Sequence, residues 1–275
     1  MELYNAVSLE ISKLLTTRYS TSFSISSRLF SGGIRPHIYA VYGLVRVADE
    51  IVDTFTGSDK EEQLNSLEAE AFAAIDRRYS TNPIVHAFAR TAQQYDIDPT
   101  LIKPFFDSMR MDLHPQEYDD ALYATYIHGS AEVVGLMCLK VFVGGDSELY
   151  AKLSPGAVAL GSAYQKVNFL RDMTDDRARL GRTYFPGVQY ETFSSADKNA
   201  IVDSITADFD AAAKTIPDLP SSSRIAVASS YVIYRKLLDK LKRASVKEIK
   251  SSRLRVSGFE KVVAILGVVI RGGKV

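Results

Sequence analysis

The sequence predicts an all-α protein, and two observations carry that prediction. Apolar residues recur at spacings of three and four along most of the 275 residues, whereas the apolar–polar alternation of a half-buried strand is nearly absent. Turn-forming residues separate the periodic stretches, as in "FSGG", "TGSD", "STNP" and "GGDSE". No internal repeat and no convincing linker divides the chain, so we expect a single domain over residues 1–275.

The predicted helices follow one another closely. The first spans about 3–18. "IRPHIYAVYGLVRVADEIVDTF" keeps its apolar spacing over 34–55, with Pro36 in the first turn, where proline is tolerated. "EEQLNSLEAEAFAAIDRRY" predicts an amphipathic helix over 61–79 that ends before "STNP". The remaining predicted helices cover about 83–95, 98–112, 119–143, 155–179, 195–214, 222–243 and 257–270.

Composition limits the classes of partner and compartment. Lys plus Arg and Asp plus Glu both number 33, so no net field attracts nucleic acid. The single cysteine, Cys138, excludes an internal disulfide and fits a reducing compartment, and its apolar setting predicts core packing. The acidic start "MELYNAVSLE" lacks the features of a signal peptide. We therefore expect a cytoplasmic protein with no nucleic-acid partner and no obligate protein partner.

A first pair of aspartates suggests a site with charge chemistry. Asp49 and Asp53 stand four residues apart, so they share one face of the predicted helix, with Arg46 one turn earlier. Like charges at this spacing cost an exposed helix about 0.2–0.5 kcal/mol, so helix stability does not explain them. Two interpretations stay open: a surface Asp–Arg pair, or carboxylate oxygens that hold a divalent cation.

A second pair, Asp172 and Asp176, lies in "AYQKVNFLRDMTDDRARLGRTYFP". Gln165 and Asn168 precede this pair at spacings that place all four side chains on one helical stripe. The stripe fits a solvated face with scattered salt bridges, or the polar wall of a cavity. In the second case, two facing aspartate pairs with arginines nearby would hold Mg²⁺, or Mn²⁺, against a diphosphate.

In their order and spacing the motifs resemble those of the squalene and phytoene synthase family. The resemblance runs from "RYSTSFSISSRLF" to "SSRLRVSGFEKV". "LVRVADEIVD" resembles the family's first aspartate-rich motif, "YQKVNFLRDMTDD" followed by "GRTYFP" resembles the second, and "YIHGSAEVVGLMCLKVF" resembles the stretch between them. The resemblance implies an isoprenoid-synthase-type helical bundle around a central, elongated apolar cavity.

The resemblance also implies roles for single residues. Tyr126 falls on the family's central tyrosine, and His128 stands two residues later. Tyr19 departs from the pattern, because some members carry a histidine there. The four aspartates, Asp49, Asp53, Asp172 and Asp176, would bind Mg²⁺ together with substrate diphosphate. Positions that contact diphosphate or organise the metals are matched by Ser20, Ser22, Arg46, Gln165, Asn168, Arg171 and Tyr234, with late positive charge from Arg253 or Arg255.

These residues also have plain structural interpretations. Ser20 and Ser22 would serve equally as helix caps, and Tyr126 and Tyr234 as core aromatics. The acidic segment "FDSMRMDLHPQEYDD", residues 106–120, is interpreted as solvated surface because its carboxylates share no consistent face.

The reaction implied by the resemblance joins two molecules of geranylgeranyl diphosphate to phytoene, through a cyclopropylcarbinyl diphosphate and without a nicotinamide cofactor. Departed diphosphate would take the proton, with Tyr126 or His128 as lesser candidates. Small residues in the central stretch would leave room for a C20 chain: Gly129, Ser130, Ala131 and Gly135. Two alternatives remain: a farnesyl-based squalene or dehydrosqualene synthase, and a non-catalytic assembly or lipid-binding factor.

Long hydrocarbon substrates and products predict transient contact with a membrane surface. The longest late apolar run, "VVAILGVVI" at 262–270, is far shorter than the roughly twenty residues that a spanning helix needs. We expect this helix to pack in the core, because it lacks the charged face of an interfacial helix.

Overall fold

The computed structural model describes residues 1–114 and 117–275, and within these ranges it leaves the side chains of Thr21, Ser22, Arg179 and Leu180 undescribed. All regular structure in the described residues is helical, which confirms the predicted fold class. The elements are α1 (Glu2–Tyr19), α2 (Thr21–Ser27), α3 (Arg35–Asp53), α4 (Lys60–Arg77), α5 (Pro83–Tyr95), α6 (Pro99–Met111), α7 (Asp120–Ile127), η1 (His128–Glu132), α8 (Val133–Val143), α9 (Ser147–Leu180), α10 (Ser195–Ala213), η2 (Ile216–Asp218), α11 (Ser221–Arg243), α12 (Val246–Ser251) and α13 (Gly258–Ile270).

Capping residues explain where several helices begin. Asn82 caps α5 and Asp98 caps α6, each directly before a proline in the first turn. The predicted start of α9 at Pro155 was wrong, because Asp146 caps this helix and accepts a hydrogen bond from the Leu149 amide. Pro155 therefore lies inside α9. The short helices α2 and α12 were not predicted, because seven and six residues are too few to establish a period.

The predicted helix at 119–143 contains a π-helical turn. α7 passes into α8 through η1, where the backbone hydrogen bonds widen to the π pattern. Gly129 lies in this turn, and a Cβ atom at this position would overlap the carbonyl oxygen of Pro104 in α6. The stretch Asp120–Val143 is also long and apolar enough to cross a membrane by length and composition. It packs against α6 and α9 inside the fold, which is the position of a core helix.

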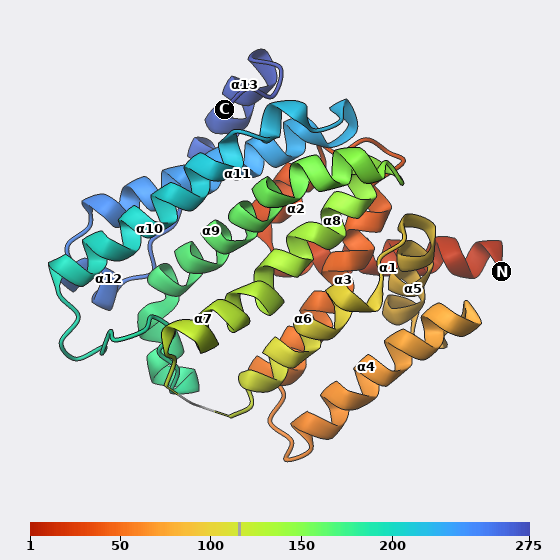
Figure 1. The fold of residues 1–275 in the computed structure, drawn as a ribbon, viewed down its shortest axis with the longest axis horizontal. Helices are drawn as coiled ribbons and strands as arrows, with labels where there is room; N and C mark the ends of the chain where they lie inside the picture. The colour runs from red at the N-terminus through yellow and green to blue at the C-terminus, as the bar shows by residue number, and fades with distance from the viewer. Residues whose placement is uncertain (115–116) are drawn as a thin grey trace.

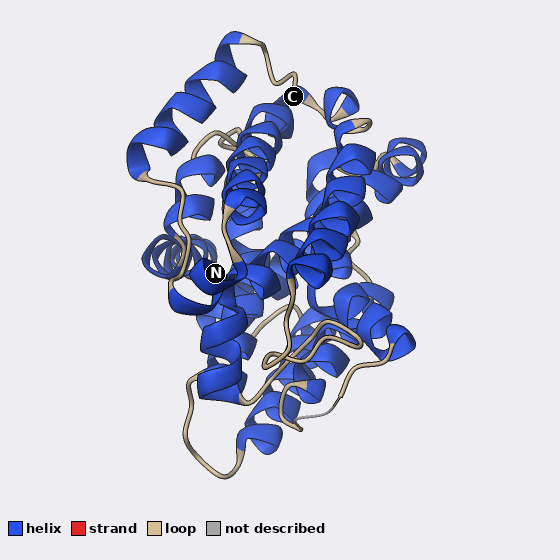
Figure 2. Cartoon of the chain, turned by 90° about the vertical axis from the view of Figure 1, so that its left-hand side faces the viewer, coloured by secondary structure: helices blue, strands red, loops and turns tan. Residues whose placement is uncertain are grey.

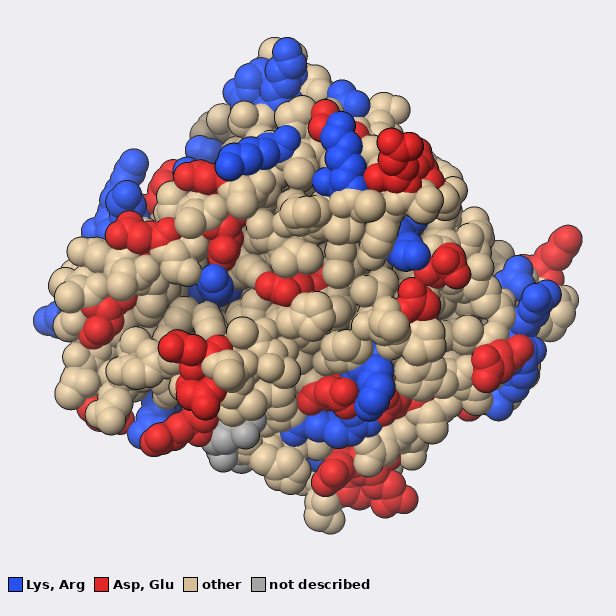
Figure 3. All heavy atoms as spheres, viewed as in Figure 1, with Lys and Arg blue, Asp and Glu red and all other residues tan. Residues whose placement is uncertain are grey.

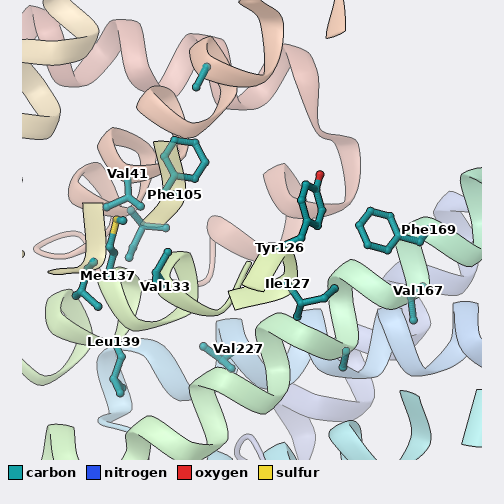
Figure 4. Close-up of a cluster of buried hydrophobic side chains, with 14 of the residues drawn as sticks. Val41, Phe105, Tyr126, Ile127, Val133, Met137, Leu139, Val167, Phe169 and Val227 are labelled. Atoms are coloured by element: carbon teal, nitrogen blue, oxygen red, sulfur yellow. The ribbon is translucent and has the colours of Figure 1, made fainter. Parts of the chain in front are cut away.

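The long helices surround a shared interior (Figure 1). α9 runs between α8 and α10, and α11 packs against both α9 and α10. α3 packs on α1, α5 and α8, and Figure 2 shows the helices from the side, without a strand among them. Buried side chains from these helices meet in one core; Tyr126 of α7 and Phe169 of α9 lie close together there, with ring centroids 5.8 Å apart (Figure 4).

α13 lies on the outside of this bundle and packs against α11. Its buried residues are only Lys261, Ala264 and Val268, whereas most of its apolar side chains are exposed. The expectation that this helix belongs to the core was therefore wrong. A helix that is apolar on nearly every side gives no signal of which side is covered.

Candidate active site

Two adjoining cavities make up the candidate site. One, of about 550 Å³, has mostly polar walls and is called the polar chamber here. The other, of about 320 Å³, has mostly apolar walls and is called the apolar chamber. The two share Val45, Ser130, Gln165 and Asn168 as lining residues, so they lie directly beside each other. This arrangement suits a ligand with a charged head and a hydrocarbon tail.

The polar chamber collects both aspartate pairs. Asp49 and Asp53 reach it from α3, and Asp172 and Asp176 from α9. Figure 3 shows acidic and basic side chains interspersed over the face of the molecule that it draws. Residues that lie more than 100 positions apart in the sequence thus line one chamber. Their assignment as metal ligands stays a prediction.

The carboxylates of the polar chamber are poorly compensated. Burial raises the pKa of Asp49 to about 7; Arg46 counteracts this, and Asp53 adds to it. Burial, together with the charges of Asp172 and Asp53, raises the pKa of Asp176 to about 7. Among the described residues, six aspartates and four arginines line the chamber, so a bound cation would be stabilised there.

Arginines occupy the same chamber. Arg46 bonds to Glu50 at 2.5 Å and lies 3.6 Å from Asp49, with its guanidinium 4.4 Å from the centroid of the Tyr19 ring. Arg171 pairs with its neighbour Asp172. The Nε atom of Arg46 and the hydroxyl of Ser130 are buried on the chamber walls without a hydrogen-bond partner among the described residues. Both atoms can donate to the oxygen of an anionic ligand.

The structure distinguishes the two late arginines. Arg253 lines the polar chamber, and its Nε lies 2.7 Å from an Asp172 carboxylate oxygen. Arg255 lines neither chamber, and its backbone carbonyl accepts a hydrogen bond from Lys240. The geometry therefore favours Arg253 of the two, and its contact with diphosphate stays a prediction.

Asp112 is one of the site residues that the sequence interpretation missed. The segment around it was expected to be solvated surface, and for Asp112 that was wrong: its side chain is 6% exposed and lines the polar chamber. It accepts hydrogen bonds from Tyr126 at 2.7 Å and Tyr184 at 3.2 Å. Burial raises its pKa to about 6 despite the nearby Arg182 guanidinium. Asp112 continues the buried spacing of Phe105 and Met109 on α6, and this signal was available in the sequence.

Arg182 connects Asp112 to the first aspartate pair. Its Nη1 lies 2.8 Å from Asp53 and 3.5 Å from the Asp112 carboxylate, and its Nη2 donates to the Asp112 carbonyl at 2.9 Å. The Arg182 and Asp112 side chains are 7% and 6% exposed, so their contact is shielded from water, whereas the Asp53 side chain is 41% exposed. Arg182 therefore fixes Asp53 relative to the Asp112 cluster.

Several predicted residues lie elsewhere. His128 does not line either chamber; it is half-exposed and pairs with Glu132 at 2.9 Å, so it is no candidate for a proton acceptor in the chambers. Ser20 lines neither chamber and caps α2 by accepting from the Phe23 amide. Ser22 lies outside the described side chains. Tyr234 lines the apolar chamber, with its hydroxyl 3.5 Å from Asn168.

The small residues predicted to leave room for the prenyl chain do not all line the apolar chamber. Ser130, Ala131 and Gly135 line the apolar chamber, whereas Gly129 packs against α6. A Cβ atom at Gly135 would lie 2.8 Å from the carbonyl oxygen of Ala157. Cys138 also lines the apolar chamber, and burial raises the pKa of its thiol to about 12, as expected for an inert packing residue.

The donor set of the polar chamber fits magnesium. Its candidate ligands are carboxylate oxygens, the donor type that this hard cation prefers. Within residues 1–114 and 117–275, no three His, Cys, Asp or Glu side chains form a ready-made ion site. Mg²⁺ usually takes one or two carboxylates and completes its shell with water and substrate phosphate, so paired aspartates suffice.

The chain is similar in sequence and in fold to proteins that are already known. The sequence model of the squalene/phytoene synthase family matches residues 16–260. The chain is 28% identical to phytoene synthase 1, chloroplastic, of Solanum lycopersicum over 275 residues, which cover 90% of this chain and 64% of that protein. It is 27% identical to 15-cis-phytoene synthase of Pantoea ananas, covering 82% and 79%. A crystal structure of a dehydrosqualene synthase in complex with ligand has the same fold, with a TM-score of 0.83 at 21% identity over 97% of both chains.

Proposed function

The chain belongs to the squalene/phytoene synthase family, and on this basis we propose that it condenses two geranylgeranyl diphosphates to phytoene. One observation carries the proposal: a chamber with two aspartate pairs and arginines adjoins an apolar chamber and shares four lining residues with it. The first would hold diphosphate and the second the prenyl chain. The names of the relatives favour phytoene as the product.

The aspartates and the arginines of the polar chamber would act on the diphosphate leaving group in different ways. Mg²⁺ held by Asp49, Asp53, Asp172 and Asp176 would neutralise the diphosphate and help the allylic carbon–oxygen bond to break. Arg46, Arg171 and Arg253 would donate to the diphosphate oxygens, since each already lies at this wall.

Aromatic and apolar walls would protect the allylic cation. Tyr126, Phe169 and Tyr184 line the polar chamber, and the Phe169 and Tyr184 rings stack at 3.8 Å. Aromatic faces attract cations, and the apolar chamber keeps water from the reacting carbons.

Bond formation then follows in two stages. The double bond of the second substrate attacks C1 of the first, and loss of a proton gives cyclopropylcarbinyl diphosphate. This intermediate loses its own diphosphate, rearranges and releases a second proton. Departed diphosphate is the proposed proton acceptor, because the Tyr126 hydroxyl is engaged as a donor to Asp112.

A substrate competition tests the proposal. With Mg²⁺ and equal amounts of geranylgeranyl and farnesyl diphosphate, we expect a C40 product that requires no nicotinamide cofactor. Activity should disappear with chelator and return with added Mg²⁺. The farnesyl-based alternative is motivated by the shared fold with a dehydrosqualene synthase; a preference for farnesyl diphosphate, or a C30 product, would establish it instead.

Arg253 and Arg255 provide a matched pair of variants. Arg253→Gln should raise KM for the prenyl diphosphate about tenfold, equivalent to about 1.4 kcal/mol of lost binding, because it removes a cation from the chamber wall. Arg255→Gln should leave KM within about twofold, since its side chain lines neither chamber. Steady-state kinetics on both variants checks this, and equal effects would argue against diphosphate contact by Arg253.

A further inference from the structure

The outward face of α13 is apolar without interruption. The exposed side chains on this face are Phe259, Val262, Val263, Leu266, Val269 and Ile270, with exposures from 43% for Val269 to 83% for Ile270. At about 100° per residue, these six fall in one sector roughly 120° wide, opposite the buried Ala264 and Val268. A helix that faces only water ordinarily carries polar residues in that sector. We call these six side chains the α13 face.

Positive charge accompanies the α13 face. Arg271 and Lys274 follow the last turn and are exposed. Glu260, at the other end, is paired with Lys240 at 2.8 Å, so its charge is compensated. In the view of Figure 3, Lys and Arg side chains lie at the top of the molecule, where Figure 1 places α13. Apolar surface with cationic residues beside it complements the headgroup region of an anionic bilayer.

The shape of this region also favours a bilayer. α13 stands at the upper end of the molecule in both Figures 1 and 2, as a projecting ridge. A protein partner would need a groove of matching shape, whereas the soft boundary between headgroups and acyl chains accepts a convex helix. With 13 residues, α13 is too short to span the hydrocarbon core and long enough to lie along its surface.

We propose that the α13 face docks this protein on the surface of an anionic lipid bilayer. The family match ends at residue 260, so ten of the thirteen residues of α13 lie beyond what that match covers. α13 packs on α11, and its end lies against the first turn of α11, where Gly273 approaches Arg224. α11 in turn lines the apolar chamber through Ala226, Val227 and Ser230. If the proposed function holds, the docked face is one helix away from the prenyl chain.

The chain contains no tryptophan, which allows a site-specific test. Val263→Trp places a unique fluorophore on the α13 face, and Val7→Trp places one at an exposed apolar position of α1 as the control. Each full-length variant is mixed with phosphatidylcholine vesicles that contain phosphatidylserine, and with pure phosphatidylcholine vesicles. We expect a blue shift and quenching by brominated acyl chains for V263W alone, on the anionic vesicles. Equal signals from both variants, or none from V263W, would overturn the proposal.

Charge and self-association are tested separately. The double variant Val263→Glu, Leu266→Glu should lose at least about tenfold in vesicle affinity in a sedimentation assay, and Arg271→Gln with Lys274→Gln should weaken binding to anionic vesicles only. Val7→Glu with Leu14→Glu is the matched control and should bind as the unmodified chain does.

Sedimentation velocity without lipid distinguishes a bilayer from a second copy of the chain as the partner of the α13 face. A dimer that the Val263→Glu, Leu266→Glu variant dissociates would show that a second copy covers the face. Vesicle binding needs no substrate, so its failure would leave the proposed reaction standing, and the reverse also holds.

Discussion

Asp49→Asn is expected to lower turnover about a thousandfold while the fold stays intact. The substitution keeps the shape of the side chain and removes one negative charge from the polar chamber. A loss of about 4 kcal/mol of transition-state stabilisation corresponds to roughly this factor. Turnover at saturating substrate and Mg²⁺ measures the effect, with Asp76→Asn at an exposed position of α4 as the control. Near-normal turnover would exclude Asp49 as a metal ligand.

The Asp49→Asn substitution should also change how the melting temperature depends on pH. Burial raises the pKa of Asp49 from 3.8 to about 7, so the folded state holds this proton more tightly than the unfolded chain. The resulting stabilisation is fully present below about pH 4 and is lost as the pH rises through about 7. In chelator, the melting temperature of the unmodified protein should therefore fall between pH 4 and 8. The melting temperature of the Asp49→Asn variant should fall less over this range. At pH 8 it should lie above that of the unmodified protein.

Asp112→Asn is expected to lower turnover about a hundredfold, which corresponds to about 2.7 kcal/mol. An amide has no charge to face Arg182 and keeps one acceptor oxygen, whereas the two carboxylate oxygens accept separately from Tyr126 and Tyr184. Arg182 would then interact more strongly with Asp53, which lies 2.8 Å away, and compete with metal there. Asp112 would thus act as a positioning residue.

The metal dependence separates this role from a purely structural one. If Arg182 competes for Asp53, the Mg²⁺ concentration for half-maximal activity should rise in Asp112→Asn. Asp107→Asn is the control, because Asp107 lies on the same helix and is exposed. A lower turnover with unchanged Mg²⁺ dependence would contradict the positioning role.

The long helices and the two aspartate pairs were predictable because both depend on spacing within one helix. Periodicity identified α3 to within two residues at each end. The pairs could be seen as pairs because residues four apart share a face. Short helices such as α2 gave no such signal.

What the sequence could not provide are relations between distant segments. The contact of Arg182 with Asp53 joins residues 129 positions apart, and no local pattern encodes it. Asp112 was misassigned because the carboxylates of its segment share no consistent helical face, whereas its neighbours in space are phenols and a guanidinium. The exposed side of α13 could not be predicted for a related reason. Only the position of α11 decides which apolar face of α13 is covered.

The single helix α9 carries parts of both chambers, and this restricts how the chain can diverge. Gly156 and Leu160 line the apolar chamber, Gln165 lies where the chambers join, and Asp172 lines the polar chamber. Inserting or deleting one residue between these positions would rotate one set against the other by about 100°. Point substitutions along α9 can therefore accumulate in related sequences, but changes in its length would be removed by selection. The spacing between its glycines and its aspartates should be held more strictly than the identities of the residues between them.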